Sequence, residues 1–320
     1  MTTPRKAALA VGLAAALALS LTSCGGDERG GIAVDPVEID NRPLGVEDPA
    51  DVPEASETDD SCEPLKSHSP SDDVDSPEIE EIVERGKLRV GVDQTSYLMG
   101  YRDPQTGRLD GFDIRIAREI ARDLLGDPDA IHFKVMSSDE RIDAVVDGEV
   151  DMVVRTMTVN CQRREDVDFS TEYYRAGQKV LVPESATDDV ADLAGEKICS
   201  SPGSTSLRRV TEELDAEPVS AHNWADCMIL VQQGHVAGMT TDDTILAGMA
   251  AQDPGTKVIG EPLSEEPYGV AVHLDHEALT RFVNHVLERI REDGTWQDIY
   301  DATLKDALGD AEPPQPQYLD

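Results

Sequence analysis

Hydroxyl and guanidinium side chains follow directly after a short apolar run in residues 151–170. Residues 152–154 (MVV) have the pattern of a buried strand, and Thr156, Thr158 and Arg163 come next. A strand that ends at a cleft would present backbone N–H groups, hydroxyls and a cation there. Because the planar guanidinium of arginine matches a carboxylate with two parallel hydrogen bonds, we expect a carboxylate-binding site. The alternative is a sheet edge that continues into a charged surface loop.

Two further loops place polar residues at the start of an expected helix. In residues 202–206 (PGSTS), a glycine frees the backbone, Ser204 or Thr205 caps the helix, and the exposed N–H groups attract an anion. In residues 240–244 (TTDDT), one aspartate can cap the helix while Asp242 points into the cleft toward a cation. Helix capping alone is the alternative for both loops. Combined with the first segment, these loops would clamp the carboxylate and the ammonium of a free α-amino acid.

The start of the chain has the pattern of an export signal. Two basic residues, Arg5 and Lys6, precede an Ala/Leu run that ends at Leu19, and small residues then lead to Cys24. We expect a secretory signal over residues 1–23 rather than a membrane span. The LTSC tetrad resembles the bacterial lipobox, which implies cleavage before Cys24 and a lipid anchor on its thiol. An ordinary cleavable signal with an incidental cysteine is the alternative.

Charge and cysteine content bound the partners and the compartment. The 320 residues suffice for about two domains, and a net charge of −37 leaves no basic face for a nucleic acid. If Cys24 carries lipid, four cysteines remain, and an even set in an exported protein indicates two disulfides with three possible connectivities. We favour Cys199–Cys227 within one lobe and Cys62–Cys161 between the preceding segment and the other lobe. A structural zinc site is the alternative, although the sequence has no C-x-x-C pair.

The order of the expected elements indicates an α/β fold with two lobes and mostly parallel sheets. Expected strands occupy residues 88–92, 131–136, 152–154, 178–182, 196–199, 236–240, 257–259 and 268–272. Expected helices occupy residues 77–85, 112–125, 140–147, 207–214, 225–233, 244–251, 276–292 and 295–308. A cleft between two such lobes is a favoured ligand site.

Composition divides the chain into further parts. Residues 24–76 are rich in Asp, Glu, Pro, Ser and Gly, so we expect an acidic disordered tether there. We assign residues 77–175 and 268–310 to lobe 1, residues 176–267 to lobe 2, and residues 311–320 to a Pro-rich tail.

Several spaced motifs resemble the type II (family 3) extracellular amino-acid-binding proteins of ABC importers. RTMTVNCQRREDVDFSTEYY is similar to their GMTITPERKKxVDFSxPYY signature, and GFDIRIAREIA, GSTS, TTDDTILAG and DGTWQDIYDATL match further family motifs. The resemblance covers residues 77–308 and implies a two-lobe periplasmic-binding-protein-like fold with a hinge of two crossovers. The pattern is closest to lipidated glutamate/glutamine-binding proteins of the actinobacterial type, which also carry the cysteines in NCQRR, KICSSPGSTS and NWADC.

The resemblance implies a shared role for five residues at the α-carboxylate of an amino acid. Thr156 and Thr158 would offer backbone and hydroxyl groups, and Arg163 would offer its guanidinium. Ser204 and Thr205 would close on the same carboxylate from lobe 2.

Other matching positions would hold the rest of the ligand. Asp242 would take the α-ammonium, and Ser138 and Arg141 match positions that reach the side-chain carboxylate of acidic ligands. Tyr97 offers the one ring in a loop that is richer in aromatics in many relatives. Asp93, in the loop after the first expected strand, is expected to face the ammonium or the solvent.

We therefore expect a lipid-anchored solute-binding protein that captures glutamate or aspartate, and also glutamine or asparagine, for an ABC importer. The cations Arg141 and Arg163, joined by Arg155 unless that side chain faces away, outnumber Asp242 and Asp93 in the expected cleft. This favours an anionic ligand over lysine or arginine. Distant carboxylates hardly affect this choice, because salt at physiological concentration screens charges beyond about 8 Å.

Two other functions remain as alternatives. A sensor subunit would pass ligand occupancy to a membrane signalling partner, and a dehydratase-type enzyme would use the same fold. The sequence has no G-x-S-x-G elbow, H-E-x-x-H helix or Gly-rich phosphate loop, so we expect neither catalysis nor a cofactor or metal. The expected partners are a free amino acid and a membrane permease or sensor, for a monomer anchored by lipid to the outer face of the cell membrane.

Overall fold

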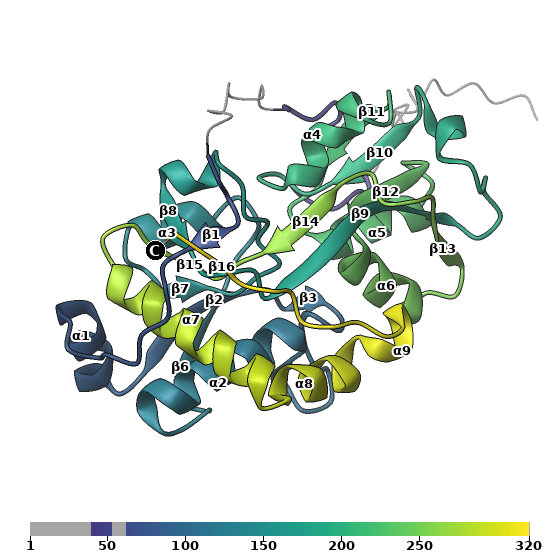
Figure 1. The fold of residues 1–320 in the computed structure, drawn as a ribbon. Coiled ribbons are helices and arrows are strands. Elements are labelled where there is room, and N and C mark those ends of the chain that lie inside the picture. Colours follow the sequence, from purple (N-terminus) through teal and green to yellow (C-terminus); the bar gives the residue numbers. More distant parts are fainter. Residues whose placement is uncertain (1–39, 53–61, 320) are drawn as a thin grey trace, which may run out of the picture. The chain divides into compact units, whose positions relative to one another are not determined.

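The computed structural model describes residues 40–52 and 62–319, and two large sheets form the centre of residues 62–319 (Figure 1). The first sheet has the strand order β6-β2-β7-β15-β8. Its strands are β2 (Leu88–Val92), β6 (Ile131–Val135), β7 (Met152–Val153), β8 (Val167–Phe169) and β15 (Ala271–His273). Strand β2 is parallel to β6 and β7, whereas β15 is antiparallel to β7 and β8.

Helices cover both faces of the first sheet. One face packs against α1 (Pro77–Arg85), α2 (Phe112–Leu125), α7 (Glu277–Glu292) and α8 (Thr295–Thr303), and the other against α3 (Arg141–Val146). Successive strand residues point to opposite faces, so Met152 packs with the first group of helices and Val153 with α3. Burial on both faces explains why this strand is apolar at every position.

The second sheet has the order β11-β10-β12-β9-β13, with β14 paired to β9. Its strands are β9 (Tyr174–Pro183), β10 (Lys197–Ser200), β11 (Glu217–Ser220), β12 (Gly238–Asp242), β13 (Thr256–Ile259) and β14 (Glu265–Tyr268). Strand β10 is parallel to β11 and β12, while β9 is antiparallel to β12, β13 and β14. Helix α4 (Thr205–Glu212) contributes to one core, and α5 (Trp224–Gln232) and α6 (Asp243–Gln252) contribute to another.

The chain crosses between the two sheets twice, after β8 and after β14. The crossing strands pair with each other, with Tyr174 opposite Tyr268 and Gly177 opposite Glu265. The expected strand over residues 268–272 is therefore two strands, β14 in the second sheet and β15 in the first. Gly269 lies at the break, where a Cβ atom would approach Val159 Cγ2 to 2.6 Å, so only glycine permits this close passage.

Parts of the expected tether lie against the folded protein instead. Glu47 forms an antiparallel bridge with Ser220 at the edge strand β11, and β1 (Lys66–Ser67) pairs with β16 (Gln317–Tyr318) in the expected tail. Cys62 forms a disulfide with Cys161. Backbone pairing and the disulfide hold these segments in place, together with side-chain bonds such as Arg164 Nη2 to Lys66 O at 2.8 Å. Residues 1–39, including the expected signal and Cys24, lie outside the described residues.

The remaining elements are short. They are β3 (Thr95–Ser96), β4 (Gly100–Arg102), β5 (Leu109–Asp110), α9 (Lys305–Leu308) and the 3-10 helices η1 (Arg163–Glu165) and η2 (Val190–Leu193). The second disulfide joins Cys199 to Cys227, so the structure contains both disulfides that the sequence analysis favours. Within residues 40–52 and 62–319, no helix is long and apolar enough to cross a membrane.

Candidate functional site

Loops from both sheets enclose a small polar cavity. Its volume is about 10 Å³, which is room for roughly one water molecule. Eight of the ten ligand-binding residues expected from the sequence line it. The full lining consists of Ser138, Arg141, Thr156, Thr158, Arg163, Ser204, Thr205, Ser206, Trp224, Thr241, Asp242 and Ile245. The structure therefore brings together the three loops that the sequence analysis selected.

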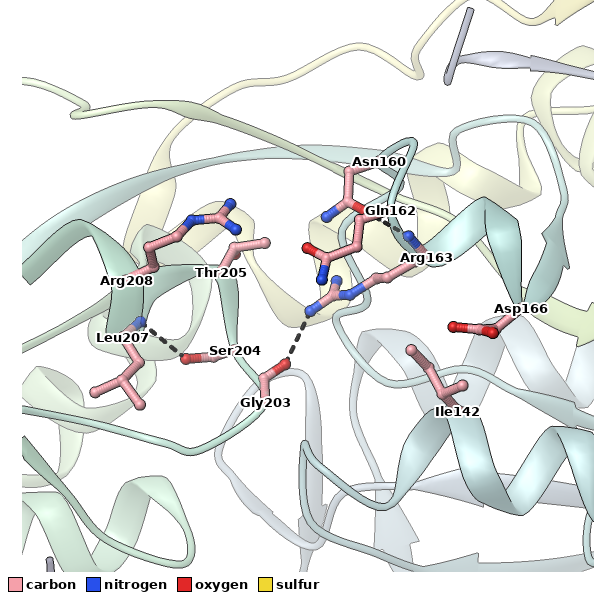
Figure 2. Close-up of a pocket in the computed structure, with 10 residues that line it drawn as sticks. All are labelled: Ile142, Asn160, Gln162, Arg163, Asp166, Gly203, Ser204, Thr205, Leu207 and Arg208. Atoms are coloured by element: carbon pink, nitrogen blue, oxygen red, sulfur yellow. Dashed lines mark hydrogen bonds between the residues drawn. The ribbon is translucent and has the colours of Figure 1, made fainter. Parts of the chain in front are cut away.

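A larger cavity of about 200 Å³ adjoins the first, because Arg163, Ser204 and Thr205 line both. Figure 2 shows Arg163 reaching from one side of this cavity toward Gly203 on the other. Asn160 and Arg208 also line it, so its wall is polar and partly cationic.

Arg163 connects the two sides of the site. Its Nη1 donates to Thr158 O at 2.7 Å, and its Nη2 donates to Gly203 O at 3.0 Å across the cleft. The side chain is buried, and burial lowers the pKa of Arg163 to about 10. Arg163 is therefore still a cation at neutral pH, and it is the main positive charge that an incoming carboxylate would meet in both cavities.

Arg141 is anchored to main-chain carbonyls. Its Nε donates to Ser138 O at 2.8 Å, its Nη1 to Arg155 O at 3.1 Å, and its Nη2 to Gly203 O at 3.2 Å. Burial, followed by repulsion from Arg163, lowers the pKa of Arg141. In this arrangement Arg141 fixes the loop after β7, and a contact with a ligand side chain remains a prediction.

The hydroxyls of Thr158 and Thr205 face a carboxylate that the sequence analysis missed. Both donate to Glu266 Oε2, at 2.7 Å and 2.8 Å, and Ser264 donates to Glu266 Oε1 at 2.5 Å. Glu266 is fully buried in β14. Its signal in the sequence is a charged residue directly before an apolar strand, in EEPYGVAV.

Thr156 adopts an unusual backbone conformation. Its φ is +37°, in the left-handed region that a β-branched residue rarely adopts. Its N–H donates to Asp113 Oδ2 at 2.9 Å, and Tyr173 Oη donates to Asp113 Oδ1 at 2.8 Å. The N–H is thus committed to Asp113 and not directed at a ligand. Burial raises the pKa of Asp113 to about 7.

The two expected helix-capping loops behave differently. Ser204 caps α4, since its hydroxyl accepts from Leu207 N at 3.2 Å. Asp242 precedes α6 without a side-chain capping bond, and its Oδ2 accepts from Tyr268 Oη at 2.6 Å. Burial, followed by the nearby charge of Glu266, raises the pKa of Asp242. A bound ammonium would stabilise the ionised form of this carboxylate.

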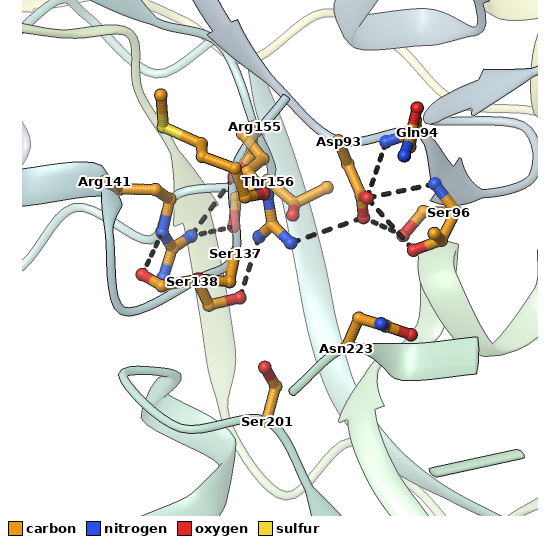
Figure 3. A network of polar contacts seen from close by, with 12 residues as sticks. Asp93, Gln94, Ser96, Ser137, Ser138, Arg141, Arg155, Thr156, Ser201 and Asn223 are labelled. Atoms are coloured by element: carbon orange, nitrogen blue, oxygen red, sulfur yellow. Dashed lines mark hydrogen bonds and ion pairs between the residues drawn. The ribbon is translucent and has the colours of Figure 1, made fainter. Parts of the chain in front are cut away.

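Asp93 differs from its expected position. It is buried, and its Oδ2 lies 3.4 Å from Arg155 Nη2, so it faces neither solvent nor an ammonium (Figure 3). Arg155 is also buried rather than facing away. Tyr97 lines neither cavity, and its ring packs edge-on against Tyr101 at 4.9 Å between centroids.

Buried carboxylates offset the buried arginines around the site. The arginines are Arg141, Arg155 and Arg163, and the carboxylates are Asp93, Asp113, Asp242 and Glu266. The sequence analysis inferred an excess of cations because it counted neither Glu266 nor Asp113, and the structure shows no such excess. Charge alone therefore does not rank an anionic ligand above a neutral one.

The chain is similar to known amino-acid-binding proteins. The glutamine-binding protein GlnH of an ABC transporter from Bacillus subtilis is 36% identical over 228 residues, covering 70% of this chain and 84% of that protein. The glutamate-binding protein GluB of Corynebacterium glutamicum is 31% identical over 236 residues, covering 69% of this chain and 80% of that protein. The structure of an ancestral arginine-binding protein bound to glutamine is 33% identical with a TM-score of 0.63, covering 71% of this chain and 99% of that one.

A family model matches residues 88–305, which include both large sheets and every residue that lines the small cavity. The chain belongs to the bacterial extracellular solute-binding proteins, family 3.

Proposed function

We propose that this protein captures glutamate, aspartate, glutamine or asparagine outside the cell and delivers it to the permease of an ABC importer. One observation carries the proposal: Arg163 and Asp242, a buried cation and a buried carboxylate, line the same small cavity. These are the partners that the α-carboxylate and α-ammonium of a free amino acid require. The glutamine- and glutamate-binding relatives support this ligand class.

Ligand capture requires the two sides of the cleft to separate and close. A cavity of about 10 Å³ is too small for an amino acid, and the bonds from Arg141 and Arg163 to Gly203 O close its entrance. The paired crossing strands β9 and β14 would act as the hinge between lobe 1 (residues 77–175 and 268–310) and lobe 2 (residues 176–267). Closure follows from affinity, because a ligand contacts both lobes only in the closed form.

The protein would act at the membrane through its N-terminus. The LTSC motif at Cys24 supports a lipid anchor on the outer face of the cell membrane. A monomeric binding protein on such an anchor would remain close to the permease that receives its ligand. No step of this function needs catalysis or a cofactor.

Calorimetric titration of the purified protein at about 0.15 M salt tests the proposal. We expect the four acidic and amide amino acids to bind, and lysine and arginine not to bind. A thermal-shift screen of the twenty amino acids provides an independent readout, because a ligand that binds the folded state raises the melting temperature. Tighter binding of arginine than of glutamate and glutamine would refute the proposed ligand class while leaving the family assignment intact.

A further inference from the structure

Trp224 lines the small cavity and carries a buried hydrogen-bond donor. It is the first residue of α5, its side chain is 2% exposed, and it lines the cavity together with Ser138 and Asp242. Its indole Nε1 has no hydrogen-bond partner among residues 40–52 and 62–319. A buried donor without a partner loses its hydration without compensation. A bound molecule with an acceptor atom would remove this cost.

Ser138 presents a second donor to the same cavity. Its Oγ accepts a hydrogen bond from Arg155 Nη1 at 2.7 Å, so the hydroxyl proton is left to donate elsewhere. Arg155 is held in place by Met136 O at 2.9 Å and by the charge of Asp93 at 3.4 Å. Figure 3 shows Ser138 and Arg155 on one side, with Ser201 and Asn223 on the facing loops.

Several other polar groups around the cavity already have partners. Thr158 and Thr205 donate to Glu266, and the guanidinium of Arg141 donates to main-chain carbonyls. Trp224 and Ser138 thus each bring to the lining of the cavity a donor for which a ligand acceptor would be a partner. An indole N–H can only donate, so this pair disfavours an ammonium or a guanidinium.

We propose that Trp224 Nε1–H donates to the distal side-chain oxygen of the amino-acid ligand, beside the hydroxyl of Ser138, which the family resemblance already assigns to that end of the ligand. This pair makes a carbonyl or carboxylate oxygen at the end of the side chain the feature that the protein selects. The inference rests on the proposed function and adds to it the residues that distinguish acidic and amide amino acids from aliphatic and cationic ones.

Replacing each of the two tryptophans of the chain tests the inference. Trp224→Phe keeps an aromatic ring but removes the donor, and we expect affinity for glutamate and glutamine to fall at least about tenfold. Trp296→Phe is the matched control, because Trp296 is equally buried but donates to Tyr173 O at 2.8 Å away from the cavity. The control should lower the melting temperature and leave affinity within about twofold of the parent.

The indole N–H resonances give a direct readout on the parent protein. With two tryptophans, the ¹H–¹⁵N spectrum has two indole signals, which the two variants assign. We expect saturating glutamine or glutamate to move the Trp224 signal downfield. Norvaline, which has the chain length of glutamine without its distal oxygen, should bind at least about tenfold more weakly to the parent and lose no affinity in Trp224→Phe.

Three outcomes would overturn the inference. Trp224→Phe could bind glutamate and glutamine as the parent does, the Trp224 indole signal of the parent could stay unmoved at saturation, or norvaline could lose as much affinity in Trp224→Phe as glutamine does. Each of these leaves the proposed function intact. A parent protein that binds none of the amino acids overturns both the inference and the proposed function.

Discussion

Paired charges define the site at the scale of residues. Each buried arginine in the cleft has a carboxylate or carbonyl partner, and each buried carboxylate accepts from a hydroxyl or main-chain donor. Such pairs matter most when one partner is removed, because the remaining charge is buried without compensation. Ligand binding should therefore respond strongly to single substitutions here and weakly to changes in the distant acidic surface.

Arg163→Ala should abolish binding of every amino-acid ligand. The substitution removes the main cation available to the α-carboxylate and leaves Gly203 O without its 3.0 Å bond. The affinity should fall by at least about two orders of magnitude in calorimetric titration. Arg175→Ala is the control, because Arg175 pairs with Glu172 outside both cavities. Parent-like affinity of Arg163→Ala would show that the carboxylate binds elsewhere.

Asp113 should make the folded protein less stable as the pH rises toward neutrality. Its folded pKa of about 7 lies above the unfolded value of 3.8, so the folded state retains a proton that the unfolded state releases. The free energy of unfolding should fall between about pH 4 and 7, by at most about 1.4 kcal/mol per pH unit from this group, and stay level above pH 7.

Asp113→Asn should remove this dependence, which urea unfolding at pH 5, 6, 7 and 8 would show. Asn cannot ionise and can still accept from Thr156 N. Asp110→Asn is the control. Arg115 holds the pKa of Asp110 below its usual value, so the contribution of Asp110 to folding stability is lost only at a pH below this range. If Asp113→Asn and the parent change in parallel from pH 5 to 7, Asp113 does not titrate in this range.

At the scale of elements, the paired crossing strands β9 and β14 connect the two sides of the cleft. They belong to the second sheet, yet Thr158, from the loop of the first sheet, bridges to Tyr268 in β14. Glu266, in the same strand, accepts hydroxyls from Thr158 and from Thr205 at the start of α4. One carboxylate at the crossing thereby joins loops from both sides of the cleft.

Glu266→Gln should change ligand choice as well as affinity. The substitution removes one of the buried carboxylates that offset the three arginines, so it should favour an anionic ligand over a neutral one. We expect the ratio of glutamate to glutamine affinity to rise about tenfold, while glutamine binding weakens. Calorimetry with both ligands measures this ratio. Glu172→Gln is the control, because Glu172 is a buried glutamate outside both cavities, and it should leave the ratio of glutamate to glutamine affinity unchanged. An unchanged ratio in Glu266→Gln would refute the argument from buried charge.

Long elements with a regular spacing of apolar residues were predictable from the sequence. Short strands that pair with residues far along the chain were not. The amphipathic helix α2 has the bounds expected from its apolar spacing. Strands β8 and β11 have few residues and depend on partners far along the chain, so no local pattern marks them. The break at Gly269 was missed because the apolar run continues across it.

In the site too, residues with a local sequence signal were predictable and residues whose roles depend on distant partners were not. Polar residues directly after apolar strands identified six of the twelve lining residues, and the family resemblance added Ser138 and Arg141. Glu266, Asp113 and Trp224 were missed because their roles depend on residues far away in sequence: Thr158 lies 108 positions from Glu266, and Thr156 lies 43 positions from Asp113. Trp224 was hidden among the apolar residues of its helix, and only its unpaired N–H in the folded protein reveals it.

At the scale of the whole molecule, function depends on how closely the two sides of the cleft approach. Gly203 is the point of closest approach: its carbonyl accepts from both Arg141 and Arg163. A Cβ atom there would lie 2.5 Å from the main-chain Cα of Asp139, which belongs to the opposite side. Since backbone atoms cannot move aside as a flexible side chain can, a side chain at this position should hold the cleft open.

Gly203→Ala should therefore block closure, and Gly234→Ala separates this effect from backbone strain. The two glycines have φ values of +69° and +71°, but a Cβ at Gly234 meets nothing within 4 Å. Both substitutions should cost about 1–2 kcal/mol of folding stability, because an alanine is forced into a left-handed conformation. Only Gly203→Ala should weaken ligand binding, by at least about tenfold. We expect the radius of gyration of the parent to decrease when glutamate or glutamine is added, and Gly203→Ala should prevent this decrease. Small-angle X-ray scattering with and without ligand measures this change. A Gly203→Ala protein that contracts and binds like Gly234→Ala would show that ligand capture does not require the Gly203–Asp139 contact.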